Sequence, residues 1–192
     1  MKTIVFSIAI IAATLSACGD NNTTAKEETK TSDTATATAP ANNTTGQQTA
    51  SVDEAVTAYL HLKNALTSDN GKEAAEGGKH LHVAMQKLDK VSFSADQKKV
   101  YDDVKEDIKE HAEHISTNAE KIEHQREHFD MLSKDMIDLV KVVEPAQALY
   151  KDHCPMYNDN KGADWLSEVK EIKNPYLGKK MLTCGTVKEE IK

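Results

Sequence analysis

The sequence predicts an all-α fold, an antiparallel four-helix bundle with an irregular C-terminal segment packed on it. That segment could include a short strand or a hairpin. Three observations predict this class. Apolar residues recur at helical spacing in four consecutive segments, turn-forming residues separate these segments, and no strand-like alternation precedes Tyr150. The chain has 192 residues, enough for one ordinary domain and flanking segments.

The N-terminus resembles the signal peptide of a bacterial lipoprotein. Lys2 precedes an apolar run over residues 4–13, which is too short to cross a bilayer because a spanning helix needs about 20 residues. Leu15-Ser16-Ala17-Cys18 follows and resembles the lipobox, whose cysteine is diacylated. We predict a signal peptide over residues 1–17 and a lipid anchor on Cys18. The alternative is a plain secretory signal with an incidental cysteine. The anchor would place the protein in the cell envelope, bound to the membrane and facing the periplasm or the outer surface.

A polar stretch follows the predicted anchor. Residues 19–50 contain no Leu, Ile, Val or aromatic residue, so they cannot bury enough apolar surface to offset the entropy lost on ordering. We expect residues 18–50 to comprise the lipidated cysteine and a disordered tether. The helical-bundle domain is then predicted over residues 51–192, with a C-terminal Cys/Met segment over residues 151–192.

Local signals set the limits of the predicted helices. The helices are expected over residues 51–70, about 72–90, 94–117 and about 120–143. Ser51-x-x-Glu54 and Ser94-x-x-Gln97 have the pattern of capping boxes, in which each side chain satisfies a free backbone N–H of the other residue. Gly77-Gly78 in the second helix predicts either close approach to a neighbouring helix or a local kink.

Charge and motifs exclude several classes of function. The formal charge is −7 and no basic stripe is present, so a nucleic-acid partner is not expected. The chain has no His-Glu-x-x-His zinc motif, no Gly-x-Ser-x-Gly elbow, no Gly-rich phosphate loop and no Cys-x-x-Cys pair. We therefore do not expect an enzyme.

Two cysteines remain besides Cys18, and they allow two interpretations. In an oxidising compartment Cys154 and Cys184 can form a structural disulfide, and composition alone favours that reading. The other interpretation is a soft-metal site, because each cysteine has a methionine close by in Cys154-x-Met156 and Met181-x-x-Cys184. Thiolates and thioethers together are the donors that select Cu(I).

Histidines are secondary candidates. His153 adjoins Cys154 and adds a possible nitrogen ligand, and His114 lies at the edge of an apolar stripe from which it can face the C-terminal segment. His124 and His128 have the i,i+4 spacing that can chelate a divalent ion, but neighbouring glutamates favour a solvated face. His111 lies within the apolar stripe and is expected to be a hydrogen-bonded core residue.

Several motifs resemble a Bacteroidota domain family of unknown function, DUF3347. They are Tyr59-Leu60-His61-Leu62-Lys63, Gln125-Arg126-Glu127-His128-Phe129, His153-Cys154-Pro155-Met156, Asn174-Pro175-Tyr176-Leu177-Gly178 and Met181-Leu182-Thr183-Cys184. Members of that family are lipoproteins, periplasmic proteins or C-terminal extensions of the periplasmic adaptor in copper/silver efflux pumps. The resemblance therefore implies metal handling at the paired Cys and Met residues, with an efflux adaptor or pump as a possible partner.

The interpretation that combines these observations is an envelope lipoprotein that binds a copper ion, Cu(I), as a chaperone or sink associated with heavy-metal efflux. Cys154 and Cys184 would be thiolate ligands, Met156 and Met181 thioether ligands, and Trp165 a shield or cation–π wall beside the ion. The alternative is a non-metal adaptor in which a Cys154–Cys184 disulfide is structural and the bundle is a protein-binding surface.

Overall fold

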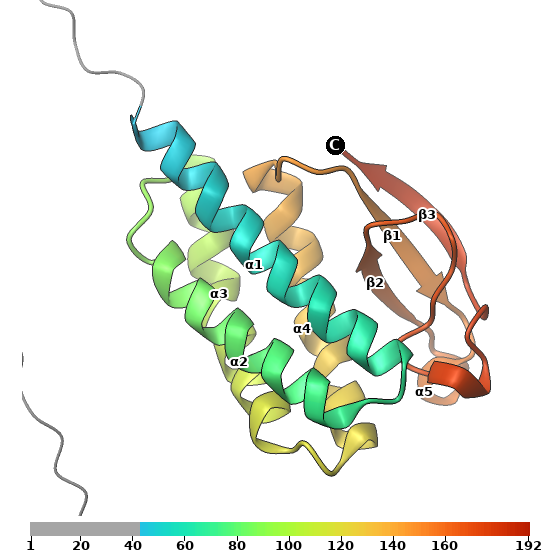
Figure 1. Ribbon diagram of the computed structural model, residues 1–192. Helices are drawn as coiled ribbons and strands as arrows, with labels where there is room; N and C mark the ends of the chain where they lie inside the picture. The colour runs from blue at the N-terminus through green and yellow to red at the C-terminus, as the bar shows by residue number, and fades with distance from the viewer. Residues whose placement is uncertain (1–42) are drawn as a thin grey trace, which may run out of the picture. The chain divides into compact units, whose positions relative to one another are not determined.

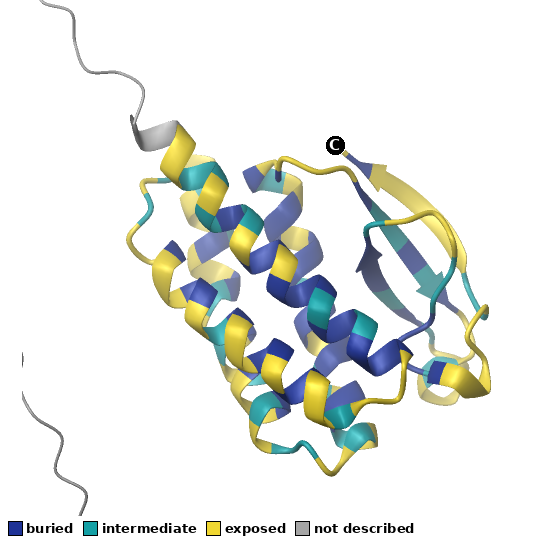
Figure 2. Cartoon of the chain, viewed as in Figure 1, coloured by how far each residue is buried: buried dark blue, intermediate teal, exposed yellow. Residues whose placement is uncertain are grey.

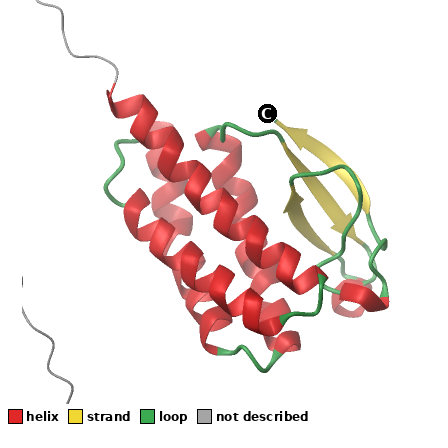
Figure 3. Cartoon of the chain, viewed as in Figure 1, coloured by secondary structure: helices red, strands yellow, loops and turns green. Residues whose placement is uncertain are grey.

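Four helices form most of the structure. The computed structural model describes residues 43–192, in which the helices are α1 (Asn43–Thr67), α2 (Gly71–Leu88), α3 (Ala95–Thr117) and α4 (Ile122–Val143). Consecutive helices run in opposite directions and are joined by short loops (Figure 1; Figure 3). The four predicted helices are thus confirmed. Among the described residues, no helix combines the length and apolar character needed to cross a bilayer.

The first helix starts earlier than predicted. It begins at Asn43, eight residues before Ser51, so Ser51 lies inside the helix and the capping box predicted there is wrong. A tertiary contact accompanies the extension, since Gln48 Nε2 donates a hydrogen bond to Gln97 Oε1 at 3.1 Å. Residues 43–50 of the predicted tether are therefore helical. The predicted signal peptide, Cys18 and the rest of the tether lie outside the described residues.

The capping box at the start of α3 is confirmed. The backbone N–H of Ser94 donates to Gln97 Oε1 at 3.1 Å, and the backbone N–H of Gln97 donates to Ser94 Oγ at 3.4 Å. Gln97 also donates through Nε2 to the carbonyl of Val142 at 3.0 Å, which ties the start of α3 to the end of α4. One side chain therefore serves both the local cap and the packing of the bundle.

Gly77 and Gly78 lie where α2 packs between α1 and α3. A Cβ on Gly77 would come within 2.7 Å of Leu62 Cα in α1, and a Cβ on Gly78 within 2.7 Å of the carbonyl oxygen of Ala112 in α3. Helix α2 continues through the pair. The interpretation as a close-approach site is confirmed, because any side chain at either position would push two helices apart.

The C-terminal segment is more regular than predicted. It contains β1 (Leu149–Cys154), the short helix α5 (Tyr157–Asn160), β2 (Ala163–Ser167), the 3₁₀ turn η1 (Gly178–Lys180) and β3 (Thr186–Ile191). The strands form an antiparallel three-stranded sheet in the order β2-β1-β3. The all-α class is therefore corrected to a mainly α fold with a small sheet. The sequence does not reveal these strands clearly. The register between β1 and β3 shifts between Lys151 and Asp152, and β3 is exposed over most of its length, so neither strand shows a regular apolar alternation.

An aromatic cluster joins the sheet to the bundle. Tyr59 of α1 stacks on Phe129 of α4 at 5.3 Å, and Tyr176 contacts both Phe129 and the fully buried Trp165 of β2. The hydroxyl of Tyr59 also accepts a hydrogen bond from the backbone N–H of Leu166 at 3.1 Å. Figure 2 shows buried residues in the bundle and in β1 and β2, with β3 mostly exposed. The sheet and the helices thus share one core.

Candidate metal centre

The structure brings Cys154 and Cys184 together. Cys154 ends β1 and is fully buried, whereas Cys184 is half-buried in the loop two residues before β3. Their sulfur atoms lie 3.4 Å apart and both thiols are free. The separation exceeds the roughly 2.05 Å of a disulfide bond. The result is a pair of thiols, one inside the core and one reachable from solvent.

Asn174 holds the loop that carries Cys184. Its side chain is fully buried, and Nδ2 donates to the carbonyl of Cys184 at 2.7 Å. Its backbone N–H donates to the carbonyl of Leu182 at 2.8 Å. Its Oδ1 accepts from the backbone N–H groups of Tyr176 and Leu177 at 2.8 and 2.9 Å. A single amide therefore fixes the Cys184 loop against the segment that follows Asn174.

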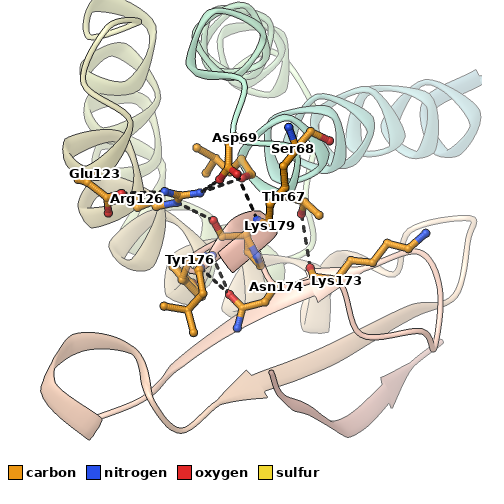
Figure 4. Close-up of polar contacts among 12 residues, drawn as sticks. Thr67, Ser68, Asp69, Glu123, Arg126, Lys173, Asn174, Tyr176 and Lys179 are labelled. Carbon is orange, nitrogen blue, oxygen red and sulfur yellow. Dashed lines mark hydrogen bonds and ion pairs between the residues drawn. The ribbon is translucent and has the colours of Figure 1, made fainter. Parts of the chain in front are cut away.

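Arg126 docks that segment on the bundle (Figure 4). The guanidinium of this nearly buried side chain donates to the carbonyl of Pro175 at 2.9 Å, to the carbonyl of Leu66 at 3.1 Å and to the carboxylate of Asp69 at 2.5 Å. Although partial burial works against it, this contact lowers the pKa of Asp69. The other Asp69 oxygen accepts from the backbone N–H of Lys179 at 3.2 Å. The Gln-Arg-x-x-Phe motif therefore positions the C-terminal segment.

The surroundings of the Cys184 thiol favour its protonated form. Burial raises the pKa of Cys184 above its usual value, and the hydrogen bond with Cys154 raises it further. Binding a metal ion through the Cys184 sulfur would therefore release its proton, as is general for thiolate sites.

The methionines lie close to the cysteines along the chain and are exposed, and His153 adjoins Cys154 in β1. Met156 is the N-cap residue of α5, in the bend after β1, and Met181 is the C-cap residue of η1. They expose 49% and 38% of their surfaces. The backbone N–H of Cys184 donates to the carbonyl of Met181 at 3.1 Å, so these two residues share a turn. His153 is turned the other way by strand alternation, and its Nδ1 lies 2.6 Å from Asp164 Oδ1. His153 is thus engaged outside the thiol pair.

Two buried charged side chains, Asp152 and Lys63, were not anticipated from the sequence. Asp152 precedes Cys154 by two positions on the same side of β1, is fully buried, and neither of its carboxylate oxygens has a hydrogen-bond partner. Burial raises its pKa to about 7, while the charge of Lys63 opposes the shift and that of Glu168 adds to it. Lys63 is itself fully buried and pairs with Glu168 at 2.8 Å. Trp165, expected as a wall for a bound ion, is buried in β2, and a Cβ on Gly185 would come within 2.9 Å of its ring.

The bundle matches a known family. Residues 55–148 match the model of a family described as a protein of unknown function, DUF3347. The DUF3347 match begins within α1 and ends at the residue before β1, so it covers most of the bundle and stops ahead of Cys154 and Cys184. No curated protein and no solved structure matches the chain. The lipoprotein form and the relation to efflux adaptors stay predictions.

The histidines are not where the sequence suggested. His114 faces the fourth helix and not the C-terminal segment, since its ring stacks on that of His128 at 4.4 Å. His111 is half-buried and not a core residue, and its Nδ1 lies 3.1 Å from Nδ1 of His128. The solvated face expected for His124 and His128 is therefore wrong in part, because both rings contact histidines of α3. The sequence signal was present, since i,i+3 and i,i+4 pairs occur on consecutive helices.

Proposed function

We propose that this protein is an envelope lipoprotein that binds a soft metal ion, copper as Cu(I), between Cys154 and Cys184, and that it serves as a chaperone or sink associated with heavy-metal efflux. The observation that carries the proposal is the pair of free thiols whose sulfur atoms lie 3.4 Å apart. The anchor on Cys18 attaches it to the membrane, and an efflux adaptor or pump is its partner. We propose no catalytic role and no nucleic-acid partner.

The donor chemistry supports copper. A sulfur ligand lies about 2.3 Å from a bound zinc ion, and a similar distance to copper lets one ion bind two sulfurs up to about 4.6 Å apart. The thiols at 3.4 Å need only a small movement to reach such an arrangement. Soft thiolate and thioether donors favour Cu(I) over hard cations.

The gradient of exposure supports a chaperone or sink. Cys154 is fully buried, Cys184 is half-buried, and Met156 and Met181 are exposed. Weak neutral thioethers at the surface can receive an ion that the buried thiolates then hold, which is the order of donors that a metal relay needs. The hydrogen bonds of Asn174 hold the Cys184 loop in place without metal, so less ordering is required on binding.

The second candidate is a non-metal adaptor with a Cys154–Cys184 disulfide, since close thiols suit both. A groove of about 570 Å³ between α1 and α2 favours it as a protein-binding surface. Its lining residues are Ala50, Asp53, Glu54, Thr57, Ala58, His61, Lys79, His80 and Val83. A thiol count without reductant separates the candidates, because a disulfide removes both thiols and a metal site leaves two.

The decisive experiment is an anaerobic Cu(I) titration of the reduced protein in competition with a chelator of known affinity. We expect one Cu(I) per chain and a loss of affinity of more than about 100-fold in Cys154→Ser or Cys184→Ser. Losing a direct ligand should cost more than the roughly 10–100-fold that is typical of losing a residue that only hydrogen-bonds to a ligand. Met156→Leu combined with Met181→Leu nearly conserves volume, so this variant should stay folded and bind Cu(I) more weakly.

His153→Gln is the matched control, because His153 adjoins Cys154 but contacts Asp164. Its affinity for Cu(I) should equal that of the parent. Unchanged affinity in Cys154→Ser would refute the thiol site, and unchanged affinity in the folded methionine variant would remove both thioethers from it.

A further inference from the structure

Four histidines form a cluster between α3 and α4. His111 and His114 project from the last two turns of α3, and His124 and His128 from the first two turns of α4. We call this set the imidazole cluster. The loop between the helices, residues 118–121, is short, so the two histidine pairs stay in a fixed relation to each other.

The geometry of the cluster suits a metal ion. His114, His124 and His128 each offer one ring nitrogen, and these three atoms lie within 4.8 Å of one another. Imidazole nitrogens bind zinc at about 2.0–2.1 Å, so two of them in a tetrahedral site lie roughly 3.3 Å apart. Small side-chain rotations would close the difference. Among the described residues, these are the three His, Cys, Asp or Glu side chains whose donor atoms all lie within 4.8 Å of one another.

Two of the rings are already oriented by second partners. Nδ1 of His124 lies 3.3 Å from a carboxylate oxygen of Glu127, and Nδ1 of His128 lies 3.1 Å from Nδ1 of His111. Both rings therefore keep Nε2 available. A hydrogen bond from the second ring nitrogen is the usual way in which a protein fixes a metal-binding histidine. Glu110 adds a further negative charge, with its carboxylate 3.9 Å from His114 Nε2.

The imidazole cluster lies outside the apolar core, and its rings are half-exposed or exposed. Burial lowers the pKa of His128, and the three neighbouring histidines lower it further. Burial also lowers the pKa of His111, against the raising effect of Glu110. The positions of the rings, and not their protonation, suit the cluster to a cation.

We propose that His114, His124 and His128 bind a borderline divalent metal ion, Zn²⁺ or Cu²⁺, and that His111 orients His128. Nitrogen donors from imidazole suit these ions, whereas the thiols of Cys154 and Cys184 suit Cu(I). The imidazole cluster is therefore a second site with a different preference, and it does not depend on the proposed function of the cysteines.

Zn²⁺ is the probe because it has no redox chemistry with thiols. The test is a calorimetric titration of the full chain, purified without a polyhistidine tag and with all three cysteines replaced by Ser. We expect one Zn²⁺ per chain. His124→Gln combined with His128→Gln should lower the affinity more than about 100-fold, because each of these residues is a direct ligand.

The matched control is His61→Gln combined with His80→Gln. These histidines form another pair between two helices, α1 and α2, with ring centroids 6.1 Å apart. They lack the third imidazole, so their loss should leave the affinity unchanged. Far-ultraviolet circular dichroism verifies that each variant is folded.

A second measurement keeps the cysteines in place. In the reduced wild-type chain, Zn²⁺ should shift the side-chain ¹⁵N resonances of His114, His124 and His128, whatever the thiols bind. The proposal is overturned if the cysteine-free chain binds no Zn²⁺, if the affinity survives His124→Gln with His128→Gln, or if the control loses as much. None of these results bears on Cu(I) binding at Cys154 and Cys184.

Discussion

Replacing Asp152 with Asn is expected to stabilise the domain at pH 8 and to reduce the dependence of its stability on pH. Asp152 is fully buried in β1 and both carboxylate oxygens lack hydrogen-bond partners. Burial raises its pKa to about 7. The folded protein therefore retains this proton up to neutral pH, whereas an unfolded chain releases it near pH 3.9.

The sign and size of the effect follow from this difference. A raised folded pKa means that the stabilisation is complete below about pH 3.9, declines as the pH rises, and is lost above about pH 7. The gap is roughly 3 pH units at about 1.4 kcal/mol each, so ionised Asp152 costs up to about 4 kcal/mol at pH 8. The side-chain amide of the Asp152→Asn variant has no proton to release, so the variant avoids this cost.

The assay is urea unfolding of the parent and of Asp152→Asn at pH 4.5, 6 and 8. The free energies of unfolding should differ by only about 1 kcal/mol at pH 4.5 and by several kcal/mol at pH 8, with Asp152→Asn the more stable. Asp164→Asn is the control with the opposite sign. Although burial opposes them, Lys151 and His153 lower the pKa of Asp164, so its loss should destabilise most at high pH. A difference between parent and Asp152→Asn that stays constant with pH would refute the reasoning.

Further variants test the parts that position the site and the predicted anchor. Gly178→Ala should destabilise by about 1–3 kcal/mol in urea unfolding, because Gly178 has φ of +52° and a Cβ there would overlap the Asp69 carboxylate. Arg126→Met should cost at least about 2 kcal/mol in the same assay, because two buried carbonyls lose their donor, and Cu(I) affinity should fall with it. Ser94→Ala should lower the stability by about 1 kcal/mol through loss of the capping box, without affecting metal binding. Cys18→Ser should release the protein from the membrane fraction or block its processing. If it stays membrane-bound and normally cleaved, the lipid anchor is wrong.

The sequence by itself determined the helical bundle. The apolar repeat of the four helices and the cap at Ser94 depend on residues within a few positions of one another, and the small residues Gly77-Gly78 were recognisable in the sequence as a site of close approach. Such local interactions leave a periodic trace that can be identified without the fold. The two cysteines and their neighbouring methionines were also visible as a candidate site, although only as residues that the chain had to bring together.

Tertiary structure decided the rest. The early start of α1 accompanies the contact of Gln48 with Gln97. The sheet forms only when β1 pairs with β3 across the intervening loops, and that pairing shifts register between Lys151 and Asp152. The distance between the two thiols depends on Asn174 and Arg126, which lie far apart in the sequence. The imidazole cluster exists because packing sets the rotation of α3 and α4 about their axes, and the sequence of either helix alone does not specify which faces meet.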